Sequence, residues 1–278
     1  KEYTSNGEDI DITSSGDKGI IIQFNEEGKI LDVKVAEGGN SYFDTIQNLD
    51  TGGYIVGARA TTNISIDGIE LNNLQNNVYV LIEVDESNIA TNITNLYVGT
   101  GSEMLRRIIT LKDGGMIIVG GINLGSTVTI PSEATSIGEI EVEATKISDG
   151  IIIRLNADRK IEFLKVIRPI NGASQDTMYS AIATDDGGYI AIWTGYEANG
   201  IEFTEEETAS GEVIRSSLHS WCSYFMKFNS ENKLEWMKWT GERDTKEIEK
   251  IGDDEYITST VSNIQDNYIT IIPGPKLV

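Results

Sequence analysis

Apolar residues recur along this chain in short, dense runs separated by turns rich in glycine, asparagine and aspartate. The run at residues 150–155 (GIIIRL) is almost continuous, and the run at 234–239 (LEWMKW) places apolar side chains on both faces of an extended strand. Such strands are typical of sheets that are buried on both faces. These segments lack the 3.6-residue period of a helix. The pattern therefore predicts an all-β protein in which each sheet lies between two other layers.

Two sequence elements repeat in step, four times. The first element covers residues 19–35, 78–94, 150–166 and 223–239. The second element, a turn followed by an apolar run, covers residues 49–57, 111–121, 184–192 and 251–259. Because two independent elements recur in the same order, chance is a poor explanation, and a repeat architecture is indicated.

Each element is predicted to be a β-hairpin. The turn of the first hairpin ends near a position that is occupied in the four repeats by Gly28, Asn88, Arg159 and Asn232. Glycine and asparagine accept the positive φ that a bulged hairpin loop needs, whereas arginine fits that position less well. In the second hairpin, aspartate favours the start of the turn and glycine supplies the left-handed residue. In the fourth repeat Asp254-Glu255 replaces Gly-Gly.

The architecture that accommodates these strands is a β-propeller of four-stranded antiparallel blades, since each blade is covered by its neighbours. A β-sandwich would show cleaner apolar and polar alternation. We expect one domain over residues 1–272, followed by a linker at 273–278, with a five-bladed or incomplete propeller as the alternative. The repeats run over residues 7–62, 63–123, 124–196 and 197–272. The run YITII at 268–272 is the expected place where the two ends meet and close the ring.

The hairpin pair resembles repeats of large extracellular and surface proteins of Gram-positive bacteria, whose recurrent form ends in a DGGYIVGG run. The residues that carry the resemblance are the 149–153 run DGIII, Asn156, Trp236, Lys34, Lys165, Lys238, Gly38-Gly39 and the DGG turns. The resemblance covers nearly the whole chain and implies propeller-like modules at the bacterial cell surface. It implies no particular activity.

The formal net charge of −22 repels phosphate backbones, so nucleic acid is excluded as a partner. No stretch approaches 18 apolar residues, so we expect no membrane insertion. The single cysteine, Cys222, rules out a disulfide within the chain, which is ordinary for Gram-positive exports. Extracellular or cell-surface localisation is therefore the expectation.

The catalytic inventory of the chain is sparse. His219 is the only histidine and lies three residues before Cys222, without an orienting partner in the sequence. Paired carboxylates for glycoside hydrolysis are available in 204–208 (TEEET) and 252–255 (GDDE), although both read as solvated loops. We predict no catalytic residues and no cofactor, except that a Ca²⁺ site is a candidate at Asp9, Asp11 and Asp17, because hard cations take oxygen ligands.

Aromatic residues flank the third long connection between hairpins, residues 196–222. Candidate ligand-binding residues there are Trp193, Tyr196, Trp221 and His219. Exposed aromatic side chains near acids and asparagine suit carbohydrate stacking or protein contacts, with core packing as the alternative. The sequence thus favours a non-catalytic, adhesin-like binding or display module that recognises a glycan or a surface protein through its long connections. A carbohydrate-active enzyme and a structural spacer are the alternatives.

Overall fold

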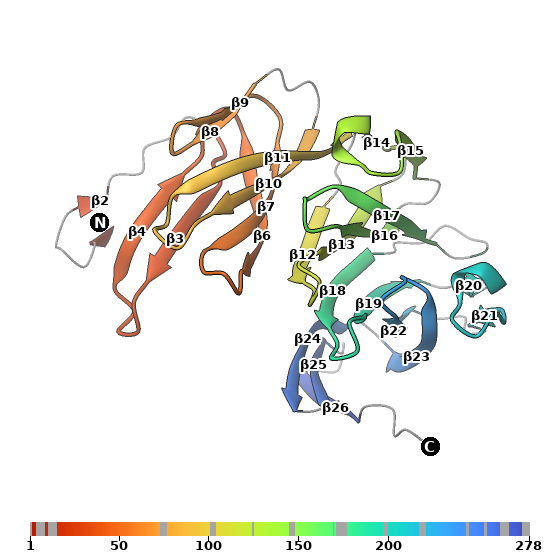
Figure 1. Cartoon of the computed structure of the whole chain (residues 1–278). Coiled ribbons are helices and arrows are strands. Elements are labelled where there is room, and N and C mark those ends of the chain that lie inside the picture. Colours follow the sequence, from red (N-terminus) through yellow and green to blue (C-terminus); the bar gives the residue numbers. More distant parts are fainter. Residues whose placement is uncertain are drawn as a thin grey trace. The chain divides into compact units, whose positions relative to one another are not determined.

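The computed structural model of the chain is built almost entirely from β-strands (Figure 1). It describes residues 2–3, 9–10, 16–72, 77–100, 104–123, 125–144, 148–168, 170, 177–196, 200–216, 221–242, 245–252, 255–261 and 267–273. Two single-turn 3₁₀ helices are the only helices among these residues, and neither is long or apolar enough to cross a membrane. The all-β prediction is confirmed. The chain divides into two compact units, Lys1–Thr100 and Gly101–Val278, and each is described by itself.

The first unit is organised around a four-stranded antiparallel sheet. Its strands are β1 (Glu2–Tyr3), β2 (Asp9–Ile10), β3 (Ile20–Phe24), β4 (Ile30–Val35), β5 (Glu37–Gly38), β6 (Ser41–Asn48), β7 (Tyr54–Ala60), β8 (Ile64–Ile66), β9 (Ile69–Leu71), β10 (Asn77–Val84) and β11 (Ala90–Gly99). The main sheet has the order β11-β10-β7-β6. The hairpin β3–β4 stands apart from it, and β5, β8 and β9 form a small third sheet.

The second unit contains two complete four-stranded sheets and a three-stranded one. Its elements are β12 (Met104–Thr110), β13 (Met116–Asn123), β14 (Thr127–Ile130), η1 (Ser132–Ala134), β15 (Ile140–Glu143), β16 (Ser148–Leu155), β17 (Ile161–Ile167), β18 (Thr177–Ala183), β19 (Tyr189–Tyr196), β20 (Glu202–Phe203), η2 (Glu205–Glu207), β21 (Ile214–Arg215), β22 (Trp221–Phe228), β23 (Leu234–Glu242), β24 (Thr245–Gly252), β25 (Glu255–Val261) and β26 (Asn267–Pro273). The sheets have the orders β12-β13-β16-β17, β18-β19-β22-β23 and β24-β25-β26. Neither unit, over the residues just given, closes into a ring of sheets.

The first hairpin of each repeat forms as predicted, and one side chain explains its turn. In β16–β17 the Oδ1 atom of Asn156 accepts a hydrogen bond from the backbone N–H of Lys160, at 3.0 Å. In the other three repeats, Asn25, Asp85 and Asn229 accept the same hydrogen bond through Oδ1. Three residues into each turn, φ is positive, at 76°, 61°, 64° and 63° for Gly28, Asn88, Arg159 and Asn232. Arg159 therefore adopts the left-handed conformation although arginine does not favour it.

The second hairpin of each repeat also forms, in β6–β7, β12–β13, β18–β19 and β24–β25. Its second glycine is needed for space. A Cβ atom on Gly53 would lie 2.1 Å from the carbonyl oxygen of Val84, and one on Gly188 would lie 2.1 Å from that of Phe228. These carbonyls belong to the first strand of the next hairpin. Each four-stranded sheet accordingly joins the second hairpin of one repeat to the first hairpin of the next.

Large apolar side chains pack the sheets of the second unit face to face. One buried cluster joins β12–β17 with β18–β23 and includes Val119, Ile152 and Trp193. A second cluster joins β19 and β22 to β24 and β25 through Phe225 and Ile248. The apolar run at 234–239 predicted a strand buried on both faces, and this strand includes Trp236 and Trp239. Trp236 does pack against the second cluster, but the prediction for Trp239 is wrong, because its side chain is 51% exposed.

Two of the long connections between hairpins have the same structure. The segments β14–η1–β15 and β20–η2–β21 share one motif, a hairpin interrupted by a 3₁₀ turn. Thr135 and Thr208 directly follow the 3₁₀ turns and are buried. They form parallel bridges to Ile161 and Leu234, the first residues of β17 and β23. The following N–H groups, of Ser136 and Ala209, donate to that same residue at 2.8 Å. The connections are therefore fixed parts of the scaffold.

Candidate functional site

Trp193 lies in the core of the second unit. Its side chain is fully buried, and its ring centroid lies 5.9 Å from that of Tyr224. A sugar or a partner protein would find no open face on this indole. The expectation that Trp193 takes part in a binding surface is thereby corrected, and the alternative of core packing holds for it.

The other predicted aromatic residues lie at the edge of the described structure. The backbones of Tyr196 and Trp221 are direct cross-strand partners on β19 and β22, but their side chains are outside the described residues. His219 is also outside them. Cys222, which follows Trp221, is fully buried and forms no disulfide. The binding role of Tyr196, Trp221 and His219 stays a prediction.

The predicted calcium ligands are described only in part. Asp17 is exposed, and its Oδ2 atom accepts a hydrogen bond of 2.6 Å from the hydroxyl of Tyr42. This acceptor raises the pKa of the Tyr42 hydroxyl, because it stabilises the protonated phenol. Asp11 and the side chain of Asp9 lie outside the described residues. Among the part of the chain that is described, no three acidic, histidine or cysteine residues gather around one point. A Ca²⁺ site here stays a prediction.

A pocket of about 250 Å³ opens where the third long connection meets the hairpins β16–β17 and β22–β23. Strand β17 contributes Phe163 and Lys165, and the connection contributes Phe203 together with Glu206 and Glu207 of η2. The turn between β22 and β23 completes the rim with Glu231, Asn232 and Lys233. The pocket thus combines an aromatic floor with charged and amide groups at its mouth.

Lys165 is the central polar group of this pocket. Its Nζ atom forms an ion pair with Oε1 of Glu207 and lies 5.3 Å from the ring centroid of Phe203. The lysine is 21% exposed and the glutamate is 33% exposed. The second oxygen of Glu207, Oε2, accepts the backbone N–H of Thr204 at 2.9 Å and so holds the carboxylate in place. Lys165 is therefore positioned by a prearranged partner.

Burial and a neighbouring cation lower the pKa of Lys165 to about 8. Removal from water disfavours the charged amine, and the guanidinium of Arg168 adds repulsion, while the Glu207 carboxylate favours the charged form. Arg168 also lines a second hollow of about 350 Å³, which shares Leu164, Lys165 and Phe203 with the first. Perturbed titration in a concave site is typical of functional positions, although structural ion pairs produce it too.

The floor of the pocket is formed by buried aromatic rings that pack against one another. Phe203 meets Phe228 edge to face, with ring centroids 6.0 Å apart, and Phe228 stacks on Tyr189 at 5.0 Å. Phe203 and Phe228 are each 1% exposed. A ligand therefore meets the polar rim and Lys165, while the aromatic rings define the depth of the pocket.

Lys34 provides a comparison, because it occupies the repeat position of Lys165. Its Nζ atom lies 2.7 Å from Oδ2 of Asp67, and that oxygen also accepts the N–H of Ala90 at 2.7 Å. Lys34 is only 9% exposed. An ion pair at this repeat position therefore recurs in the first and third repeats. The lysine of the fourth repeat, Lys238, instead lies over the ring of Trp236, at 4.7 Å.

Sequence reasoning missed the role of Glu207, because TEEET at 204–208 read as a solvated loop. The signal that could have revealed it is the alignment of this segment with PSEAT at 131–135, where Thr208 matches Thr135 and Gly211 matches Gly138. Both glycines have positive φ, at 70° and 91°. Recognition that the two connections repeat would have placed Glu207 at the last position of a 3₁₀ turn.

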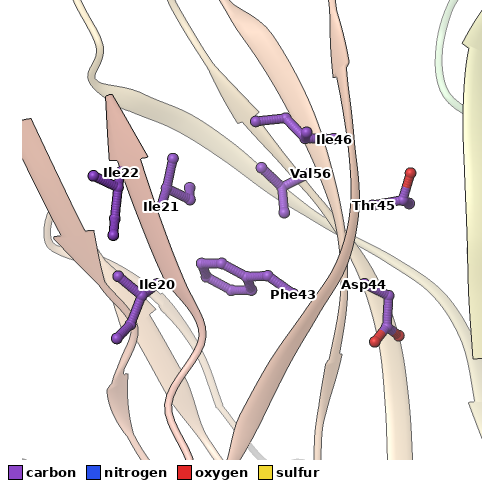
Figure 2. A pocket seen from close by; sticks show the side chains of 8 residues that line it. All are labelled: Ile20, Ile21, Ile22, Phe43, Asp44, Thr45, Ile46 and Val56. Atoms are coloured by element: carbon purple, nitrogen blue, oxygen red, sulfur yellow. The ribbon is translucent and has the colours of Figure 1, made fainter. Parts of the chain in front are cut away.

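A second concavity lies in the first unit and is lined by isoleucine, valine and phenylalanine residues together with Asp44 and Thr45. It has a volume of about 280 Å³ and runs between β3 and the strands β6 and β7 (Figure 2). Figure 2 shows the ring of Phe43 reaching from β6 toward the isoleucines of β3. Ile20 and Ile22 are 38% and 41% exposed, and Ile46 is 51% exposed. Such a groove suits an apolar polypeptide partner better than a small polar ligand.

The chain was compared with models of protein families and with curated proteins, and none of them matches it.

Proposed function

We propose that this protein is a non-catalytic binding module that recognises a carbohydrate or a protein ligand through the long connection of its third repeat. The observation that carries the proposal is the pocket around Lys165, built from that connection and from the hairpins β16–β17 and β22–β23 of the scaffold. Binding residues on connections held by a rigid scaffold are a common arrangement.

The chemistry of the pocket favours a polyhydroxylated ligand. Glu206 and Glu231 are exposed acceptors, Lys233 is an exposed donor, and Asn232 offers both a donor and an acceptor. A volume of about 250 Å³ is small for an extended ligand and suits one sugar ring or one polar side chain. Lys165 adds a fixed cation at the bottom of the rim, where it would meet a ring oxygen or an acidic substituent.

The binding experiment compares two lysines at the same repeat position. The wild-type chain, Lys165→Met and Lys34→Met are each applied to a broad glycan array and a panel of surface proteins. We expect ligands of the wild type to lose at least tenfold in affinity with Lys165→Met and to be kept by Lys34→Met. Lys165→Met loses the ion pair with Glu207, and Lys34→Met loses those with Asp67 and Asp32, so a general effect of destabilisation would appear in both.

Two results would overturn the binding proposal. One is the absence of any ligand for the wild-type chain across both panels. The other is unchanged affinity in Lys165→Met and in Glu206→Gln, a second variant on the exposed rim that leaves the Lys165 ion pair intact.

We further propose that the four-stranded sheets are blades of a β-propeller from a secreted or cell-surface bacterial protein. The proposal is supported by four repeats, by the shared strand order of the sheets and by their face-to-face packing in the second unit. A five-bladed or incomplete ring remains the alternative. A crystal structure with a closed ring of blades is the expected result, and independent tumbling of the two units by NMR relaxation would overturn it. A leader peptide in the full gene would test the localisation.

A further inference from the structure

Strand β3 exposes a face that is buried at the same position in every other repeat. Its apolar side chains Ile20, Ile22 and Phe24 are 38%, 41% and 55% exposed. The equivalent side chains are at most 3% exposed and belong to β10, β16 and β22: Val80, Ile82, Val84, Ile151, Ile153, Leu155, Tyr224, Met226 and Phe228. The contrast arises from what surrounds the strand, because the residue types are alike.

One edge of β3 also lacks the strand pairing that its counterparts have. Strands β10, β16 and β22 each pair on one side within their own hairpin and on the other side with β7, β13 or β19. Over the described residues, β3 pairs with β4 alone. Its second edge therefore presents backbone N–H and C=O groups. The three equivalent strands use these groups to pair with the second hairpin of the preceding repeat.

The groove in Figure 2 is the space that such a hairpin would fill. In the second unit, β18 is the counterpart of β6, and it packs against β12 and β13. Met178, the counterpart of Phe43, is fully buried there. In the first unit, Phe43 instead borders the groove beside β3. An interface of the kind that would cover this groove is thus formed in the second unit, between β18 and the hairpin β12–β13.

We propose that β3 and the adjoining groove bind a β-hairpin of the DGG type, supplied by another polypeptide segment, which adds to the free edge of β3 and fills the groove against β6. The known pairings give the register. Tyr224, Met226 and Phe228 pair with Trp193, Ala191 and Tyr189, so Ile20, Ile22 and Phe24 would pair with the same three positions of the incoming strand.

The two faces of the incoming strand are distinguishable. In β19, Ile190 and Ile192 point to the sheet that follows, whereas Tyr189 and Trp193 point to the sheet that precedes. The isoleucine face would therefore enter the groove against β6, and Tyr189 would stack beside Phe24 as it does on Phe228. Main-chain pairing supplies affinity in such strand addition, and the alternating side chains supply specificity.

The experiment uses a synthetic peptide of residues 177–196, labelled with a fluorophore, and the full chain. We expect saturable binding that weakens at least tenfold when the chain carries Ile22→Asp. A peptide with Ile190→Asp and Ile192→Asp should not bind. The matched control chain carries Ile251→Asp, an exposed isoleucine of β24, and should bind as the wild type does.

Hydrogen exchange locates the bound peptide. We expect added protection of the amides of β3, from Ile20 to Phe24. Absence of saturable binding, or binding that Ile22→Asp leaves unchanged, would overturn the proposal. Protection that appears in β22 instead of β3 would also overturn it, because the peptide would then have replaced the native β18–β19 hairpin.

Discussion

Phe24 and Phe228 occupy the same position in the repeat, yet Phe24 is 55% exposed and Phe228 is 1% exposed. Phe228 stacks on Tyr189 and meets Phe203 edge to face. We expect Phe228→Ala to lower the free energy of unfolding by about 3–5 kcal/mol, since it leaves a cavity in a packed core. Phe24→Ala should cost less than about 1 kcal/mol. Urea denaturation of both variants measures the difference, and equal losses would contradict the comparison.

The amine of Lys165 should titrate far below an ordinary lysine. Burial and Arg168 lower its pKa to about 8. Carbon-13 NMR of the labelled side chain, assigned by its loss in Lys165→Arg, should show a midpoint near pH 8. A midpoint above pH 10 would contradict the expectation and would mean that the Glu207 carboxylate outweighs burial.

The same shift sets the direction of a pH effect on stability. Between about pH 8 and the ordinary lysine pKa of 10.5, the unfolded chain binds more protons at this position than the folded chain does. The free energy of unfolding therefore gains a contribution from Lys165 as the pH rises through this window. In Lys165→Met that contribution should be absent, which thermal unfolding at pH 8 and pH 10 can measure.

An ion-pair triad should make the protein sensitive to acid. The Nζ atom of Lys227, nearly buried, lies 2.8 Å from Asp186 and 3.2 Å from Glu235. Although partial burial acts in the other direction, hydrogen bonds from Lys227, Thr184 and Gly188 lower the pKa of Asp186 to about 2.

This carboxylate therefore adds stability above its ordinary pKa of 3.8, and the contribution is lost as the pH falls toward 2. Asp186→Asn should flatten the acid limb of a plot of unfolding free energy against pH. Asp158→Asn, at an exposed turn position, serves as the control. An unchanged acid limb in Asp186→Asn would show that other groups dominate acid unfolding.

Gly188 should tolerate no side chain, for reasons of space. A Cβ atom there would lie 2.1 Å from the carbonyl oxygen of Phe228, so Gly188→Ala should cost about 1–3 kcal/mol or more. Gly211 has a positive φ of 70° and open space around it. Gly211→Ala should therefore cost only the left-handed backbone penalty, about 1–2 kcal/mol. Denaturation midpoints test this order, and a larger loss for Gly211→Ala would reverse it.

The sequence by itself was sufficient for the local structure. Hairpin turns are determined by neighbouring residues, so Asn156 and the positive φ of Arg159 could be placed from the repeat alone. The segment TDDGGYIAIW shows this well: Thr184–Gly188 forms the predicted turn, and Tyr189 begins a buried strand. Burial on both faces also followed from the near-continuous apolar run of β16, whereas the similar run of β3 is exposed on one face.

Only the tertiary structure decided which of two like residues is covered. Trp193 is buried and Trp239 is half exposed, although both lie in apolar strands, because exposure depends on the sheet that packs alongside. The same holds for the candidate site: Lys165 and Glu207 are 42 residues apart. The match between residues 131–135 and 204–208 places the turn that ends at Glu207, but it does not show which lysine that carboxylate contacts. Turn geometry is a local property of the chain, whereas burial and the pocket at Lys165 depend on contacts between segments that are distant in sequence.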